Sequence, residues 1–242
     1  MKKSINFLPL IILAILLISN LNHGILSNPK GYIINMILIL PGIVVGVTFH
    51  EFAHAFASSK LGDPTPNMQG RLTLNPAAHF DLYGLISLIF CGFGWGKPVQ
   101  INNRYYKSKR RDELVVSIAG VAMNLFLAFL FSIILKIWFK FNGSLIMKPD
   151  SLIGIISTIL MGIISINIIL AIFNLLPIPP LDGFSILNNL FNLEKYDWYY
   201  KIYNNGFIIL LLLLVTGVVN FIISPISSSL NYLFIYKIAA GL

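Results

Sequence analysis

The sequence predicts an all-α fold, a polytopic membrane bundle of five or six transmembrane helices. Hydrophobic residues make up 57% of the 242-residue chain and charged residues only 11%, with a mean hydropathy of +0.82. A soluble domain carries about 25% charged residues and could not bury this much apolar surface. Several apolar runs approach or exceed the roughly 20 residues needed to cross a bilayer. We therefore expect one integral-membrane domain over residues 1–242.

Five apolar runs are candidates for transmembrane helices. The first follows Lys2 and Lys3 and shows no clear small-residue cleavage site, so we expect a retained helix that enters from the cytoplasm. Pro41 predicts a kink in the second run. Residues 226–242 form either a short sixth span or a helix at the membrane surface. The five predicted spans are residues 5–18, 32–59, 114–138, 152–176 and 207–223.

Two shorter segments lie between the second and third spans. Residues 84–96 are apolar but too short to cross the bilayer, and three glycines weaken a helix there, which favours a re-entrant or interfacial element. The preceding stretch, residues 60–82, is polar and rich in proline, asparagine and glycine. Within it, residues 70–74 are expected to pair as a short strand or hairpin.

The net charge of +8 is concentrated in short segments between the apolar runs. In a soluble protein this charge would suggest a nucleic-acid partner, whereas here it is typical of cytoplasmic loops that follow the positive-inside rule. Attraction to anionic lipid headgroups would add about 1 kcal/mol per basic residue near the surface. We expect no nucleic acid and a bilayer as the partner. The densest basic segment contains Arg104, Lys107, Lys109, Arg110 and Arg111.

The order of the spans places two distant segments at one membrane face. With the N-terminus inside, the second span ends near Ser59 on the cytoplasmic side. Because residues 84–96 do not cross, the basic segment is cytoplasmic as well. The third span leaves the cytoplasmic face and the fourth returns to it, ending near Pro177. The ends of the second and fourth spans are therefore expected to meet.

The second span contains His50-Glu51-Phe52-Ala53-His54, an HExxH pattern. On a helix, residues at i and i+4 lie one turn apart on one face, so both imidazoles can reach one zinc ion. Glu51 lies between them, where it can accept a proton from zinc-bound water. Ionisable groups inside a membrane helix are costly and usually mark function, which weakens the alternative of a hydrogen-bonded core histidine. The pattern predicts a catalytic zinc site.

A catalytic zinc ion takes three protein ligands and leaves a fourth position for water. Asp182 directly follows the fourth span, and the topology places it at the same face as His54. The alternative for Asp182 is a turn or capping residue before Gly183, and His79 is a rival third ligand. We expect His50, His54 and Asp182 to bind one Zn²⁺ per chain.

Polar residues also share faces of the third and fourth spans. Asn124 lies on the third, and Asn167 and Asn174 lie on the fourth. An asparagine inside a membrane is as often a helix–helix hydrogen-bonding residue as a substrate contact. Asn124 and Asn174 are the candidates for substrate binding.

Five segments together resemble the site-2 proteases, specifically the small bacterial and archaeal group without PDZ or CBS domains. They are HEFAHA, GRLTLNPAAHFD, GWGKPVQIN, SIAGVAMN and NLLPIPPLDG, in family order over about residues 42–190. The resemblance implies zinc ligation by His50, His54 and Asp182, and Glu51 as the catalytic base. It also suggests that Asn124 lies near the active site, in contact with the substrate backbone or the oxyanion. Val121 and Phe184 depart from the usual family residues, proline and glycine, and put only local packing in doubt.

These observations predict a zinc metalloendopeptidase of the cell membrane, with its active site toward the cytoplasm. Its substrates would be transmembrane segments of other proteins, which must unwind locally because a helix hides its peptide bonds. One alternative is a membrane zinc peptidase for soluble or lipidated peptides, which would take a glutamate as third ligand, with Glu113 and Glu194 as the spare candidates. The other is a non-catalytic membrane scaffold that retains the site. The oligomeric state, the substrate and the cleavage position stay open.

Overall fold

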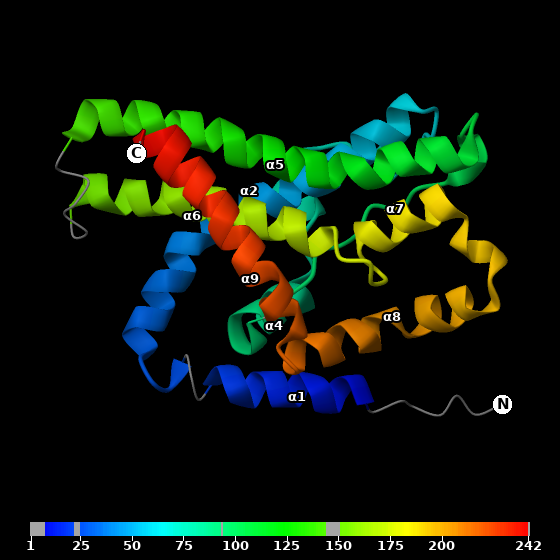
Figure 1. The fold of residues 1–242 in the computed structure, drawn as a ribbon, viewed down its shortest axis with the longest axis horizontal. Coiled ribbons are helices and arrows are strands. Elements are labelled where there is room, and N and C mark those ends of the chain that lie inside the picture. Colours follow the sequence, from blue (N-terminus) through cyan, green and yellow to red (C-terminus); the bar gives the residue numbers. More distant parts are fainter. Residues whose placement is uncertain (1–7, 22–24, 93, 144–150, 242) are drawn as a thin grey trace.

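The computed structural model describes residues 8–21, 25–92, 94–143 and 151–241. Over these ranges the chain is helical with no β-strand, and only an isolated antiparallel bridge joins Phe80 to Gly96. The all-α prediction is confirmed. The helices (Figure 1) are α1 (Leu8–Asn20), α2 (Pro29–Lys60), α3 (Thr65–Met68), α4 (Leu82–Cys91), α5 (Lys109–Asn142), α6 (Leu152–Asn174), α7 (Asp182–Phe191), α8 (Asp197–Val215) and α9 (Val218–Asn231), with short 3₁₀ turns at Pro76–Ala78, Asn103–Tyr105 and Leu193–Lys195.

Five helical segments of the described chain are long and apolar enough to cross a membrane: α2, α5, α6, α8 and the continuous helix Val218–Ala240. The last of these is α9 continued by a wider π-type helix over Tyr232–Ala240. Helices α2 and α5 contain 32 and 34 residues, so each extends about 50 Å at 1.5 Å per residue. Both exceed the roughly 30 Å hydrocarbon core of a bilayer. The chain is a multi-pass membrane protein.

Small residues let α2 and α6 approach closely. A Cβ atom placed on Gly42 would lie 3.0 Å from the carbonyl oxygen of Gly162, and one on Gly46 would lie 2.6 Å from a methyl group of Leu170. The two α2 glycines are four residues apart and so lie on one face of the helix. In lipid, where apolar side chains gain little by leaving the solvent, such close backbone packing and interhelical hydrogen bonds stabilise the bundle.

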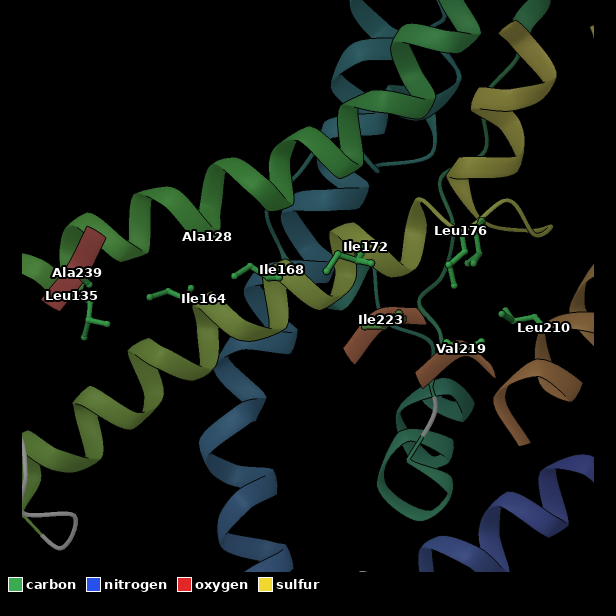
Figure 2. Packing of buried hydrophobic residues seen from close by; sticks show 11 residues of the cluster. Ala128, Leu135, Ile164, Ile168, Ile172, Leu176, Leu210, Val219, Ile223 and Ala239 are labelled. Carbon is green, nitrogen blue, oxygen red and sulfur yellow. The ribbon is translucent and has the colours of Figure 1, made fainter. Parts of the chain in front are cut away.

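A cluster of buried apolar side chains joins α5, α6 and the C-terminal helices. Leu135 of α5 and Ile164 and Ile168 of α6 are fully buried. Figure 2 shows the cluster following α6 from the region of Ala239 toward Leu210 of α8. Dispersion contacts among closely packed side chains hold these helices together.

Helix α4 and the segment after it occupy the stretch for which the sequence predicts a re-entrant or interfacial element. The helix has 10 residues, about 15 Å, which is too short to span. Asp81 caps its start by accepting a hydrogen bond from the Gly84 N–H, and Gly92 ends it with a left-handed backbone, φ 69°. The chain then returns to its starting point, where the backbone N–H of Lys97 donates to the carbonyl of His79 at 2.7 Å. The segment therefore begins and ends at the same place in the structure, as a re-entrant or interfacial element would.

The expected strand at residues 70–74 is wrong. This stretch is a series of bends and has no ladder partner in the described chain. Its conformation is determined by Arg71, whose backbone N–H donates to the carbonyl of Pro66 at 2.8 Å. The Arg71 side chain is 7% exposed and donates to the carbonyls of Ala78 and Lys97. Hydrogen bonds from the buried Arg71 side chain to loop carbonyls therefore stand in place of the backbone hydrogen bonds of a hairpin.

The predicted fifth span, residues 207–223, is also wrong in its bounds. Gly217 adopts a left-handed conformation with φ 77°, which ends α8 at Val215 and starts α9 at Val218. Figure 1 shows that the two helices follow different directions. Residues 226–240, for which two readings were open, form the second part of the helix that begins at Val218. The predicted first span lies partly outside the described residues, and its described part is α1, with 13 residues.

The ends of α2 and α6 lie toward the same end of the bundle, as the order of the spans predicts. In Figure 1 the C-terminal end of α2, the start of α5 and all of α7 gather toward the right, whereas the end of α5 and the start of α6 lie at the left. The basic residues Lys109, Arg110 and Arg111 begin α5 at the right-hand end. The end of α2, the start of α5 and helix α7 therefore lie toward one end of the bundle (Figure 1).

Candidate metal centre

Three potential metal ligands converge from two distant parts of the chain. His50 and His54 lie one turn apart on α2, and Asp182 is the first residue of α7. The Nε2 atoms of the histidines are 3.0 Å apart. The Oδ2 atom of Asp182 lies 3.2 Å from Nε2 of His50 and 3.3 Å from Nε2 of His54. Within the described chain, this is the only set of three such side chains close enough to share one ion.

The geometry of the group fits zinc. Zn–N and Zn–O bonds of 2.0–2.2 Å give a tetrahedron with edges of about 3.3 Å, close to the measured 3.0–3.3 Å between ligand atoms. The Oδ2 atom of Asp182 is buried without a hydrogen-bond partner in the described chain, and a bound cation would satisfy this acceptor. Three protein ligands leave a fourth position for water, as in catalytic zinc sites.

Helix α5 orients both imidazoles. Nδ1 of His50 lies 2.7 Å from Oδ1 of Asn124, and Nδ1 of His54 lies 2.8 Å from the backbone carbonyl of Val116. Both partners are acceptors, so each ring carries its proton on Nδ1 and presents Nε2 as a ligand. The backbone partner Val116 could not be recognised from the sequence, because every residue carries a carbonyl.

Asn124 links three helices. It is fully buried, and its Nδ2 donates to the carbonyl of Gly46 on α2 at 3.1 Å and to Oδ1 of Asn167 on α6 at 2.9 Å. Both amide hydrogens are therefore engaged within the protein. The structure gives Asn124 a positioning contact with His50, of the kind that fixes the tautomer of a ligand. Contact of Asn124 with a substrate stays a prediction.

Asn174 occupies the last turn of α6 and is partly buried. Its Nδ2 donates to the carbonyl of Leu170 in its own helix at 3.0 Å. Contact of Asn174 with a substrate stays a prediction. Asn167, which shares its helix face, proves to be the third member of the polar network, and its burial inside an apolar helix is the signal that marks it.

Gly120 allows α5 to lie directly against the two histidines. A Cβ atom at this position would lie 2.5 Å from Cε1 of His50 and 2.5 Å from Nε2 of His54, far inside van der Waals contact. Any other residue would have to push the imidazoles or the helix aside.

The link between α6 and α7 brings Asp182 to the group. Gly183 packs against the carbonyls of Leu175 and Leu176 at the end of α6, where no side chain would fit. Asp182 does not act as a capping residue, because Leu181 occupies the N-cap position and no side-chain capping bond forms. The alternative of a capping aspartate is therefore not what the structure shows.

Glu51 lies between the two histidine ligands in sequence but outside the group of three. Its Oε2 accepts a hydrogen bond from the backbone N–H of Val99 at 3.0 Å. Val99 belongs to the segment that returns from α4, and the glutamate side chain is only partly buried. His79, the rival ligand, is fully buried elsewhere, with Nε2 2.7 Å from the carbonyl of Thr73.

Removal of the third ligand is expected to remove the metal. We predict that purified Asp182→Ala loses its stoichiometric zinc, whereas His79→Ala keeps about one zinc per chain, because only Asp182 reaches both histidines. Elemental analysis of the two variants measures this. Zinc retained by Asp182→Ala and lost by His79→Ala would make His79 the third ligand.

A methyl group at position 120 is expected to disturb the same site. Gly120→Ala should weaken zinc affinity by about 10- to 100-fold, the range seen when ligand orientation is lost. Gly162→Ala is the matched control, since its Cβ would meet nothing closer than the carbonyl of Leu38 at 3.6 Å. Competition with a zinc chelator measures both affinities, and equal values for the two variants would contradict the packing of α5 on the histidines.

Comparisons with known proteins agree with this site. Residues 38–215 match the family model described as "Peptidase family M50". The chain is 37% identical over 183 residues to a Bacillus subtilis protein named "Putative zinc metalloprotease YwhC", covering 76% of this chain and 82% of that protein. It is 29% identical over 199 residues to "Putative zinc metalloprotease Rip2" of Mycolicibacterium smegmatis (80% and 72% covered) and 31% identical over 168 residues to "Putative zinc metalloprotease MJ0611" of Methanocaldococcus jannaschii (67% and 75% covered). No solved structure matches the chain significantly. The chain belongs to peptidase family M50, the site-2 protease family of membrane zinc metalloproteases.

Proposed function

We propose that this protein is an intramembrane endopeptidase that hydrolyses peptide bonds within or near the transmembrane segments of other membrane proteins. The main support for the proposal is the distance of the zinc ligands from the basic residues at the ends of their apolar helices. His54 lies six residues before Lys60, the end of α2, which is about 9 Å along the helix. Gly120 lies nine residues after Arg111, about 13 Å along α5. With the basic residues at the membrane surface, the ligands lie inside the roughly 30 Å hydrocarbon core.

The donor set suits amide hydrolysis. A zinc ion held by His50, His54 and Asp182 would supply Lewis acidity and lower the pKa of a water molecule that it binds. Glu51 accepts the proton of the attacking water and returns it to the leaving amine. Its side chain is partly exposed, which leaves the carboxylate accessible to water and substrate.

Transmembrane segments are the substrate class that suits a site at this depth. The backbone groups of a membrane helix are hydrogen-bonded within the helix, so the scissile bond becomes accessible only where the helix unwinds. We propose that the substrate segment unwinds locally beside Glu51. The substrate would reach the site by lateral diffusion within the bilayer.

The two alternatives receive less support. A peptidase of soluble or lipidated peptides would use a glutamate as third ligand, but Glu113 is hydrogen-bonded to Asn103 and Glu194 to Asn188, away from the group of three. A non-catalytic scaffold would not need three ligand atoms at tetrahedral spacing with both imidazoles oriented.

We also propose that the site opens toward the cytoplasm. The basic cluster at the start of α5 favours that side under the positive-inside rule. The C-terminal end of α2, which carries His50 and His54, and helix α7, which begins with Asp182, lie toward the same end of the bundle as this cluster (Figure 1).

Loss of the proposed base is expected to abolish cleavage without loss of metal. Glu51→Gln should lower the rate of cleavage of a transmembrane reporter by at least about 100-fold, the lower range for general acid–base catalysis, with zinc content unchanged. The assay uses purified protein in proteoliposomes, with elemental analysis of the same samples. Near wild-type turnover by Glu51→Gln would remove the base assignment. Wild-type cleavage of soluble peptides alone would remove the proposed substrate class.

The orientation is tested by labelling single cysteines in a Cys91→Ser background with a thiol reagent that cannot cross membranes. Cysteines at Ser108 and Lys195, both exposed at the face of the basic cluster, should react only in opened cells. A cysteine at Ser144, which lies between α5 and α6 outside the described residues, should react in intact cells. The reverse pattern would invert the proposed topology.

A further inference from the structure

The segment of residues 97–102, here called the 97–102 loop, is held at both ends by buried charged side chains. At its start, the carbonyl of Lys97 accepts a hydrogen bond from Nη1 of Arg71 at 3.4 Å. At its end, the backbone N–H of Asn102 donates to Oδ2 of Asp63 at 2.7 Å. Arg71 is 7% exposed and Asp63 is fully buried. Both anchors come from the polar segment that directly follows α2.

Asp63 connects the 97–102 loop to the last turn of α2, the helix that carries His50 and His54. Its carboxylate also accepts hydrogen bonds from the backbone N–H of Thr65 at 2.9 Å and from the hydroxyl of Ser58 at 2.8 Å. Ser58 is the α2 residue one turn beyond His54. Burial raises the pKa of Asp63, but hydrogen bonds from Thr65, Asn102 and Ser58 outweigh it and hold the pKa below its ordinary value. At neutral pH the group is an ionised acceptor.

The buried guanidinium of Arg71 forms hydrogen bonds with backbone carbonyls. It donates to the backbone carbonyls of Ala78 and Lys97, which lie before and after α4 in the sequence. A buried charge is costly unless its hydrogen bonds are made. Two buried charged side chains therefore hydrogen-bond to the backbone of one short loop. This costly arrangement indicates that the loop must be held in one position.

The midpoint of the loop contacts the catalytic glutamate. Val99, two residues after Lys97 and three before Asn102, donates its backbone N–H to Oε2 of Glu51 at 3.0 Å. Each residue spans at most about 3.5 Å, so anchors this close leave the Val99 N–H little freedom. With Oε2 held, Oε1 is the oxygen that remains to take the proton of the attacking water.

We propose that Asp63 and Arg71 are positioning residues for hydrolysis, which hold the 97–102 loop so that the Val99 N–H orients the carboxylate of Glu51. The inference rests on the proposed role of Glu51 as the base. Neither residue hydrogen-bonds to a zinc ligand in the described chain. Their loss should therefore slow the chemical step and leave zinc and substrate binding intact.

Asp63→Asn is the direct test, because it keeps the volume of the side chain and removes one acceptor oxygen. In zinc-loaded protein in proteoliposomes, it should lower kcat for a transmembrane reporter by about 10- to 100-fold, since a displacement of about 1 Å costs this much. KM and zinc content should stay at wild-type values. Gln100→Ala is the matched control on the same loop, because the exposed side chain of Gln100 bonds only to exposed Gln69 in the described chain, and it should cleave at the wild-type rate.

A double-mutant cycle separates positioning from general loss of structure. Val99→Pro removes the N–H that holds Glu51, so Asp63→Asn should add little further loss in the Val99→Pro background. Losses that multiply, loss of zinc from Asp63→Asn, or a wild-type kcat for Asp63→Asn would each overturn the inference. Where Asp63→Asn does not fold, Arg71→Lys, which keeps the charge but not the guanidinium fork, is carried through the same cycle with the same criteria. Wild-type protein without Glu51-dependent cleavage would instead overturn the proposed function, and this inference with it.

Discussion

The close contact between α5 and the histidine face of α2 is the interaction on which the metal centre depends. Gly120 lies against both imidazoles, and the absence of a side chain there lets α5 present its acceptors to them. Asn124 and the Val116 carbonyl then define which ring nitrogen carries the proton. A wider helix separation would break the hydrogen bonds that orient the two imidazoles.

The same contact extends into the bundle through polar side chains. Asn124 bonds to α2 and, through Asn167, to α6, whose own close approach to α2 is allowed by Gly42 and Gly46. In a membrane these hydrogen bonds have no competing water, so they specify one arrangement of the three helices. The ligand His50 is thus held by the same network that holds the bundle together, and the site and the fold cannot be separated.

Hydropathy predicted most of the helices because the bilayer imposes a length and a composition on every span. It placed α2, α5 and α6 correctly and found that α4 is too short to cross. Hydropathy did not predict the break between α8 and α9 at Gly217. The average hydropathy of a segment contains no information about a left-handed backbone conformation. The strand expected at residues 70–74 is wrong for a different reason: the buried side chain of Arg71 donates to loop carbonyls there, and no strand forms in the described chain.

The sequence by itself determined the features that depend on local periodicity and on the count of spans. His50 and His54 share a face because a helix repeats every 3.6 residues, and the order of the spans brought Asp182 to them. Only the tertiary structure decided which groups orient these residues: the Val116 carbonyl, the Val99 N–H and the side-chain oxygen of Asn124. The physical reason is that backbone N–H and C=O groups are the same at almost every position, so their partners are chosen by packing.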